Sequence, residues 1–254
     1  MIDGVRTAGV APDELVKRVK QPRLAELVAR SLRDDILRGA LKEGDRLPAF
    51  DELLERFEVS APVGREAVRI LETEGLLSVR RGNVGGAVVH LPSSARVGYM
   101  ASLVLQTERV RLSDVGIALS ELEPRCAALC AQTAARDSDV LAGLDAALAE
   151  EDAGNSNGAG ADQFHGVLVD RCGNEALALA VRALRAIWDG HGRQEVEDEP
   201  EGAIAHARIA ALIAGGDKRE AFLAEHEHLH VSGRYVPDDD VAIDHDRVTG
   251  QTPR

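Results

Sequence analysis

Two arginines in the N-terminal part of the sequence have the type and spacing that contact with nucleic acid requires. Arg65 and Arg69 lie four residues apart and therefore share one face of a helix. A guanidinium group on that face can donate hydrogen bonds to a phosphate or to O6 and N7 of guanine. A basic turn follows at Arg81, Gly82 and Asn83, where a basic side chain beside a glycine can enter a narrow minor groove. These residues predict non-covalent binding of a DNA duplex.

The segments that contain these residues predict two short helices and a hairpin. Residues 51–57 form an amphipathic pattern with one apolar face, and the chain then turns before a second helix. Ser60 is suited to cap that second helix and to contact a phosphate, and Gly75 ends the helix. Residues 77–79 and 87–89 alternate like strands on either side of the basic turn. This order is typical of a winged helix, which places one helix in the major groove and a loop on the neighbouring backbone or minor groove.

The sequence around these elements resembles the DNA-binding domain of GntR-family transcription regulators. The matching positions, at fixed spacing, are Arg33, Ile36, Leu37, Gly39, Leu41, Gly44, Leu47, Pro48, Glu52, Leu53, Val59, Ser60, Arg65, Glu66, Ala67, Arg69, Leu71, Gly75, Leu76, Arg81, Gly82, Gly85 and Gly86. The resemblance implies a DNA-binding domain whose contacts come from the residues singled out above: Ser60, Arg65, Arg69, Arg81, Gly82 and Asn83.

Three positions depart from the family pattern. Asp51 and Ala61 stand where the family often has arginines, and Gly64 stands where it usually has an apolar residue. An acidic residue at a phosphate-facing position repels the duplex, and a glycine inside a helix costs up to about 1 kcal/mol relative to alanine. We therefore expect operator binding that is weaker or differently specified, with the DNA-binding function retained.

The remainder of the chain resembles the all-helical ligand-binding domain of FadR-type GntR regulators. The resemblance covers about residues 105–232 and rests on Phe164, His165, Leu168, Gly173, Asn174, Leu177, His206, Ile209, Gly216, Asp217, His228 and Leu229. Many domains of this type hold a divalent metal between one aspartate and three histidines from different helices. The resemblance therefore implies a metal site, with zinc as the expected ion, formed by Asp162, His165, His206 and His228.

The chemistry of this ligand set is reasonable, although one position departs from the family. Neutral imidazole suits zinc, nickel or a similar ion, and open coordination positions leave room for a carboxylate effector. The family's aspartate lies four residues before the first histidine, where this chain has Ala161. Asp162 lies three residues before His165 and is the expected replacement, because residues three or four apart share a helix face. The alternative is a pocket in which the three histidines are hydrogen-bonded polar groups and an organic anion binds without metal.

Helical periodicity predicts a mainly α protein with two domains. A winged helix-turn-helix of three helices and a β-hairpin precedes an antiparallel bundle of six to seven helices. The expected bundle helices lie at 95–107, 111–135, 137–152, 160–172, 175–190, 201–215 and 217–234. The expected divisions are a mobile arm at 1–20, the winged helix at 21–91, a linker and connecting helix at 92–104, an effector-binding and dimerisation domain at 105–235, and a disordered acidic tail at 236–254.

Charge and composition favour a globular protein of a reducing compartment. The net charge is −13, but residues 1–92 hold equal numbers of acidic and basic side chains, so the acidic excess lies in the second domain. Local phosphate contacts matter more for DNA affinity than total charge. No apolar run is long enough to span a bilayer, no secretory signal pattern begins the chain, and three cysteines do not indicate a disulfide framework. We expect a cytoplasmic location, and we interpret Cys126 and Cys130 as buried thiols rather than ligands of a soft metal.

These features favour a ligand-responsive transcription regulator over an enzyme. Two winged helices related by a two-fold axis are suited to a palindromic operator, so we expect a homodimer. A small carboxylate effector in the helical domain would change the placement of the DNA-binding heads, with repression as the expected sign. The alternative is a metal-dependent hydrolase built on His165, His206 and His228, but no carboxylate is clearly placed as its general base.

Overall fold

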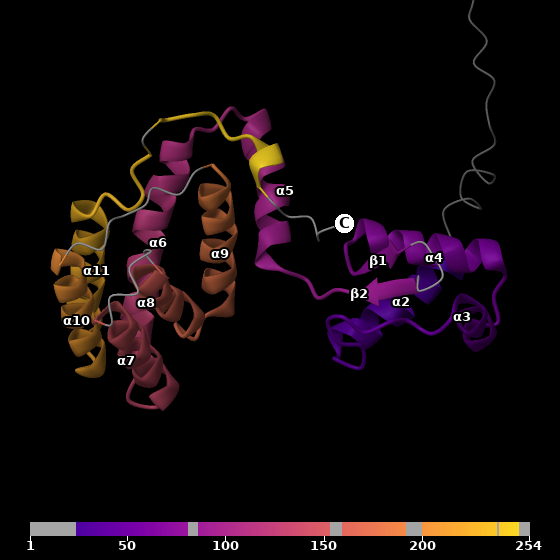
Figure 1. The fold of residues 1–254 in the computed structure, drawn as a ribbon, viewed down its shortest axis with the longest axis horizontal. Helices are drawn as coiled ribbons and strands as arrows, with labels where there is room; N and C mark the ends of the chain where they lie inside the picture. The colour runs from indigo at the N-terminus through magenta and orange to yellow at the C-terminus, as the bar shows by residue number, and fades with distance from the viewer. Residues whose placement is uncertain (1–23, 81–85, 153–158, 192–199, 238, 249–254) are drawn as a thin grey trace, which may run out of the picture. The chain divides into compact units, whose positions relative to one another are not determined.

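The chain folds as two compact units, each with its own hydrophobic core (Figure 1). The computed structural model describes residues 24–80, 86–152, 159–191, 200–237 and 239–248. The first unit ends at Pro92 and the second begins at Ser93, within one residue of the expected boundary. The predicted fold class, a winged helix-turn-helix followed by a helical bundle, is confirmed.

The first unit consists of three helices and a two-stranded antiparallel sheet. Its elements are α2 (Leu24–Leu37), α3 (Phe50–Phe57), α4 (Ala61–Thr73), β1 (Leu77–Arg80) and β2 (Gly86–Val89). The strands pair in a register that sets Leu77 opposite Val89 and Arg80 opposite Gly86. The core of this unit is formed by apolar residues from all three helices and both strands, among them Val28, Leu32, Ile36, Leu53, Ala67, Leu71, Leu77 and Val89.

Close packing of α3 against α4 explains the glycine that departs from the family pattern. Gly64 is buried, and a Cβ atom built on it would lie 2.5 Å from Cδ2 of Leu54 and 3.2 Å from Cζ of Phe50. A side chain at this position would therefore require the side chains of Leu54 and Phe50 to move. Gly64 thus combines low helix propensity with a close contact between the two helices.

The second unit is a bundle that contains seven α-helices within the described part of the chain. They are α5 (Ser94–Thr107), α6 (Leu112–Thr133), α7 (Ser138–Asp152), α8 (Ala159–Asp170), α9 (Glu175–Gly190), α10 (Pro200–Ala214) and α11 (Lys218–Val231). Helix α6 packs against α8, α9, α10 and α11, and α7 packs against α8 and α10 (Figure 1). The largest fully buried side chains of this unit are Phe164, Leu119, Leu144, Leu168, Ile187, Ile209, Ile213, Leu229 and Ile243.

Side-chain caps fix the first turns of three bundle helices. Ser93 caps α5, Asn174 caps α9 and Asp217 caps α11, each through an oxygen that accepts a backbone N–H three residues on. The N-cap role predicted for Asn174 is confirmed. Helix α5 lies along α9, where a Cβ atom on Gly98 would be 2.7 Å from the carbonyl oxygen of Ala183. Helix α5 is therefore a packed part of the second unit as well as the connection to the first.

The expectation of a disordered tail from residue 236 is wrong for residues 239–248. This stretch contains a short 3-10 helix, η1 (His245–Arg247), and the side chains of Ile243 and Val248 are buried in the bundle. The acidic composition suggested solvation, but two apolar side chains and main-chain hydrogen bonds to the start of α6 hold the segment in place.

Candidate functional site

The predicted recognition helix is α4, and its two arginines lie on the surface. Arg65 and Arg69 are exposed, on a different face from the buried Ala67 and Leu71. Among the described residues, neither guanidinium group forms an ion pair. Ser60 occupies the N-cap position of α4 and is exposed, but its hydroxyl makes no capping hydrogen bond. Helix α4 thus presents two guanidinium groups and one hydroxyl outward.

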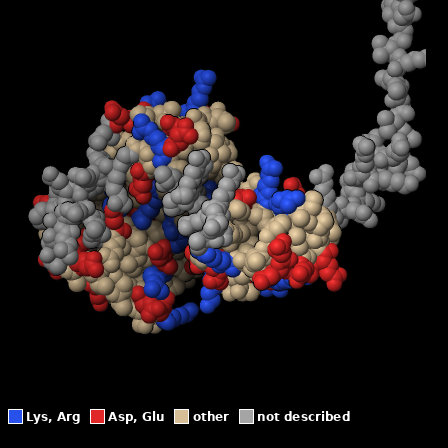
Figure 2. Space-filling view, turned by 45° about the vertical axis from the view of Figure 1, so that its right-hand side comes forward, with Lys and Arg blue, Asp and Glu red and all other residues tan. Residues whose placement is uncertain are grey.

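The basic turn predicted at Arg81, Gly82 and Asn83 lies outside the described residues, while the strands that flank it are paired as expected. Sequence reasoning missed Arg46, an exposed basic residue whose backbone bridges to Val88 of β2 and so extends the sheet. Its place beside the hairpin, rather than any local pattern, makes it a further candidate for phosphate contact. Figure 2 shows basic and acidic side chains in small separate groups on the visible face.

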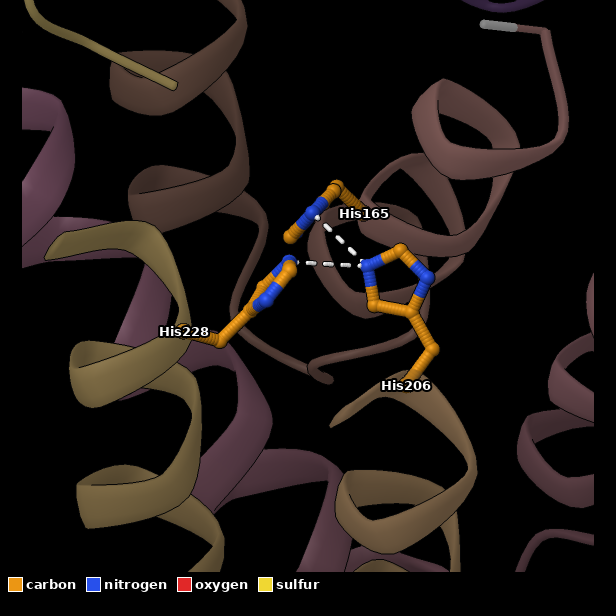
Figure 3. A group of neighbouring side chains, drawn as sticks. All are labelled: His165, His206 and His228. Atoms are coloured by element: carbon orange, nitrogen blue, oxygen red, sulfur yellow. Dashed lines mark hydrogen bonds between the residues drawn. The ribbon is translucent and has the colours of Figure 1, made fainter. Parts of the chain in front are cut away.

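Three histidines from different helices converge in the second unit (Figure 3). His165 lies on α8, His206 on α10 and His228 on α11. Nε2 of His206 is 3.3 Å from Nε2 of His165 and 2.9 Å from Nε2 of His228. His165 and His206 are buried, and the ring of Phe164 stacks on His206 at a centroid distance of 4.3 Å. The bundle therefore brings together the three histidines that the sequence indicated, although 63 residues separate the first from the last.

Buried carboxylates hold the other ring nitrogens of two of these histidines. Nδ1 of His165 lies 2.9 Å from Oε1 of Glu225 and 3.8 Å from Oε2 of Glu123. Nδ1 of His206 lies 2.7 Å from Oε1 of Glu151, near the end of α7. These contacts orient both rings from the Nδ1 side, and the Nε2 atoms consequently point toward one another.

Two partly buried arginines and a buried tyrosine complete the polar interior. Nε of Arg185 donates to Oε1 of Glu123 over 2.5 Å and to the hydroxyl of Tyr235 over 3.2 Å. The Tyr235 hydroxyl in turn donates to the same Glu123 oxygen. Nη2 of Arg234 donates to Oδ1 of Asp162 over 2.5 Å. Sequence reasoning missed these groups, because isolated charged residues inside helical segments resemble solvated surface positions until the helices are packed.

The geometry does not support Asp162 as the replacement for the family's aspartate. Within the described residues, the compact group of ligand atoms around His206, all within 4.8 Å of one another, comprises the three histidines alone. Asp162 instead accepts the hydrogen bond from Arg234. One residue along a helix turns the side chain by about 100°, so a carboxylate at 162 projects from a different direction than one at 161 would.

Burial sets the protonation of this site. It lowers the pKa of His165 well below its usual range, and the positive charge of Arg234 lowers it further. Burial likewise lowers the pKa of His228 to about 3. For Glu225, burial first and the neighbouring Glu123 carboxylate second raise the pKa to about 8. Near neutral pH, His165 and His228 are therefore neutral and Glu225 is protonated.

The histidine cluster fits a divalent cation by the type of its ligands. Neutral imidazole nitrogen is a ligand of zinc and similar ions, and a carboxylate on the far ring nitrogen is the usual outer partner of a metal-binding histidine. The cluster contains four carboxylates and two guanidinium groups: Glu123, Glu151, Asp162 and Glu225 against Arg185 and Arg234.

The other candidate ligands lie elsewhere. His226 and His230 flank His228 in sequence but lie on a more exposed face of α11, where their rings stack on each other. Cys126 and Cys130 are buried, as interpreted from the sequence, and burial raises the pKa of both thiols, that of Cys130 to about 12. Thiols held in the protonated form are poor metal ligands and poor nucleophiles.

Comparison with known proteins gives a family match for each of the two units. Residues 24–88 match the bacterial regulatory proteins of the gntR family, and residues 117–231 match the FCD domain. The HTH-type transcriptional regulator LutR of Bacillus subtilis is 27% identical over 213 residues, which cover 76% of this chain and 92% of LutR. An uncharacterized HTH-type transcriptional regulator of Mycobacterium tuberculosis is 26% identical over 217 residues, 83% of this chain and 88% of that protein.

A solved structure described as Streptococcus agalactiae GntR has the same fold. It superposes with a TM-score of 0.61 and 24% identity, and the match covers 84% of this chain and 100% of that one. The two matched domains define a DNA-binding transcription regulator whose second unit is a helical FCD domain. The chain belongs to the GntR family and carries an FCD domain as its second unit.

This assignment favours a transcription regulator over the enzymatic alternative raised by the histidines. The family and its named relatives are transcription regulators, not enzymes, and no comparison supports a hydrolase.

Among the described residues, none of the helices combines the length and apolar character that crossing a lipid bilayer requires.

Proposed function

We propose that this regulator binds a palindromic operator as a homodimer and that a small carboxylate in the FCD domain, held with the help of a divalent metal, controls this binding. Repression is the proposed sign, and the cytoplasm is the proposed location. The observation that carries the proposal is the convergence of three histidine Nε2 atoms, with carboxylates behind two of the rings.

The DNA-binding part of the proposal rests on the outward face of α4. Arg65 lies in the second turn of this helix and is the best-placed group for a guanine edge or a phosphate. Arg69, one turn later, is assigned to the backbone, and Ser60 to a phosphate at the start of the helix. Arg81, Gly82 and Asn83 are assigned to the minor groove by their place in the sequence between β1 and β2.

In the FCD domain, His165, His206 and His228 would hold the metal through Nε2. A bound divalent cation would supply Lewis-acid attraction for a carboxylate. Glu225 and Glu151 fix the orientation of two of the rings, and burial keeps imidazole protons from competing with the metal. Because the protein provides three ligands where the family has four, coordination positions remain for an oxygen ligand from the effector.

Metal content and operator binding test this proposal together. The purified full-length protein is analysed for zinc, nickel and other metals, and fluorescence anisotropy measures its affinity for its own upstream DNA at moderate salt. We expect one metal per chain, preference for the upstream DNA over a scrambled duplex, and a change in that affinity with one member of a panel of carboxylates. A protein that binds no metal and shows no sequence preference contradicts the proposal.

A matched pair of variants separates the buried site from surface histidines. His206→Gln removes the central member of the cluster, whereas His230→Gln removes an exposed histidine of α11. Loss of metal from the first variant alone is the expected result. Chelation of the wild-type protein is expected to lower the melting temperature, because metal binds only the folded state.

A further inference from the structure

The segment after α11 lies outside the matched FCD domain, yet it contacts the histidine site. We call residues 234–237 and 239–248 the C-terminal strap. At its start, Arg234 donates to Asp162 of α8, and Tyr235 donates to Glu123, whose second carboxylate oxygen lies 3.8 Å from Nδ1 of His165. The strap therefore begins on the groups that surround the candidate metal ligands.

The backbone of the strap fits tightly against the start of α6. A Cβ atom on Gly116 would overlap the carbonyl oxygen of Tyr235, so the two segments touch backbone to backbone. Farther along, Asp240 pairs with Nε of Arg111 at 2.5 Å and accepts the N–H of Ser113 at 3.1 Å. Asp240 thus accepts a hydrogen bond from a free backbone N–H at the beginning of α6, and this contact holds the start of the helix against the strap.

Main-chain hydrogen bonds continue this attachment. The N–H of Leu112 donates to the carbonyl oxygen of Val241 over 2.9 Å, and the N–H of Ile243 donates to that of Val110 over 3.0 Å. The side chain of Ile243 is 2% exposed. A segment held by backbone bonds and a buried side chain moves together with the start of α6, because displacement relative to that helix would break these contacts.

The far end of the strap contacts α5 and the end of α9. Nδ1 of His245 lies 2.5 Å from Oε1 of Gln106, and its ring lies 5.9 Å from that of Tyr99, both on α5. The N–H of Asp244 donates to Nε2 of His191 over 2.8 Å. Helix α5 begins two residues after the end of the DNA-binding unit. The strap consequently contacts the groups around the histidine site at one end and, at the other, the helix that leads into that unit.

We propose that the C-terminal strap couples occupancy of the histidine site to α5. The inference rests on the proposed metal site. Cation binding at the histidines changes the position of His165 and the charge beside the Glu123 carboxylate. This carboxylate accepts the hydrogen bond from the Tyr235 hydroxyl, so Tyr235 responds to the same change. The protein then favours the arrangement of strap and α5 that binds the cation more tightly. The coupling free energy is set by the ratio of cation affinities in the favoured and the disfavoured arrangement.

Hydrogen exchange of the full-length protein with Zn²⁺ alone tests the coupling. Zn²⁺ is added to the metal-free protein, its binding is measured by calorimetry, and exchange is followed in α5 and in the strap. We expect wild-type protein to gain protection in both segments on Zn²⁺ binding. His245→Ala and Gln106→Ala are expected to bind the same amount of Zn²⁺ and to lose the Zn²⁺-dependent protection of α5. In these variants the strap residues around Tyr235 should still gain protection on Zn²⁺ binding.

Asp239 and Asp240 provide a matched control within the strap. Asp240→Asn removes the pair with Arg111, whereas Asp239 is an exposed neighbour whose side chain makes no hydrogen bond within the described residues. The first variant should weaken the response of α5 and the second should leave it intact. Zn²⁺ binding that leaves α5 unchanged in the wild type, or changes it equally in His245→Ala, overturns the coupling alone. Failure of the wild type to bind Zn²⁺ overturns the metal site and the coupling together.

Discussion

Nδ1 of His165 lies 2.9 Å from Oε1 of Glu225, and both side chains are enclosed within the bundle. An imidazole that is held on one nitrogen by a carboxylate has its other nitrogen fixed in direction. In this protein the other nitrogen points at His206. The pair therefore links a buried carboxyl group to the three-histidine cluster. Because this group is ionisable, its protonation can be followed through the stability of the protein.

The stability of the metal-free protein should decrease as pH rises from 6.5 to 8. Glu225 has a folded pKa of about 8, above the value of 4.5 for an unperturbed glutamate. The unfolded state therefore loses this proton at lower pH than the folded state, and stability declines through the interval up to the folded pKa. The loss over pH 6.5–8 is about 2 kcal/mol at 1.4 kcal/mol per pH unit. Urea unfolding at several pH values measures it.

Glu225→Gln is the matched variant for this pH dependence. The amide imitates the protonated carboxyl and does not titrate, so the decline between pH 6.5 and 8 should disappear. His165 and His228 have lowered pKa values and so contribute to a loss of stability below pH 6.5, as the unfolded chain takes up protons first. An unchanged slope above pH 6.5 in the variant would show that another group is responsible.

Gly64→Ala should destabilise the DNA-binding unit. Helix propensity alone predicts a gain of up to about 1 kcal/mol from this change. The new Cβ would approach Cδ2 of Leu54 to 2.5 Å, and overpacking of this kind costs about 1–3 kcal/mol. Gly202→Ala, in α10 with nothing within 4 Å of its Cβ position, is the control and should be neutral or stabilising. Thermal unfolding of both variants decides the sign.

Arg65→Ala should weaken binding to the upstream DNA by about 10- to 100-fold, as expected for loss of one good base or phosphate contact. Arg65→Lys keeps the charge but not the planar fork, so it should recover only part of the loss. Arg208→Ala, an exposed arginine of α10 paired with Glu227, is the control. Anisotropy titrations at two salt concentrations measure the effect, and equal losses in Arg65→Ala and Arg208→Ala would refute the assigned role of α4.

Removal of Glu151 should affect the metal site without removing a ligand. Its Oε1 lies 2.7 Å from Nδ1 of His206, so Glu151→Ala frees that ring to rotate. Loss of such an outer partner typically lowers metal affinity by about 10- to 100-fold. Glu150→Ala, the adjacent exposed residue of α7, is the control. Competition with a chromophoric chelator gives both affinities, and equal values would assign Glu151 a purely structural role.

Much of this protein was determined by local sequence pattern. The bounds of α9 agree with the predicted range, and the other bundle helices agree within a few residues, because apolar periodicity and capping residues such as Asn174 act over one or two turns. The three histidines were identified by their spacing within a family pattern. The winged helix followed from its turn residues and its alternating strands.

Tertiary structure alone decided which charged residues lie inside and what they contact. Arg185, Glu123 and Glu225 look like ordinary surface residues of helices, and only packing brings them into a network within the bundle around His165. The same applies to the strap, whose acidic sequence suggested disorder, and to Gly64, whose need for a close helix contact is not visible in one helix. Local sequence determines the helices, because their hydrogen bonds close within four residues. The site depends on contacts across dozens of residues, and these arise from the fit of one helix against another.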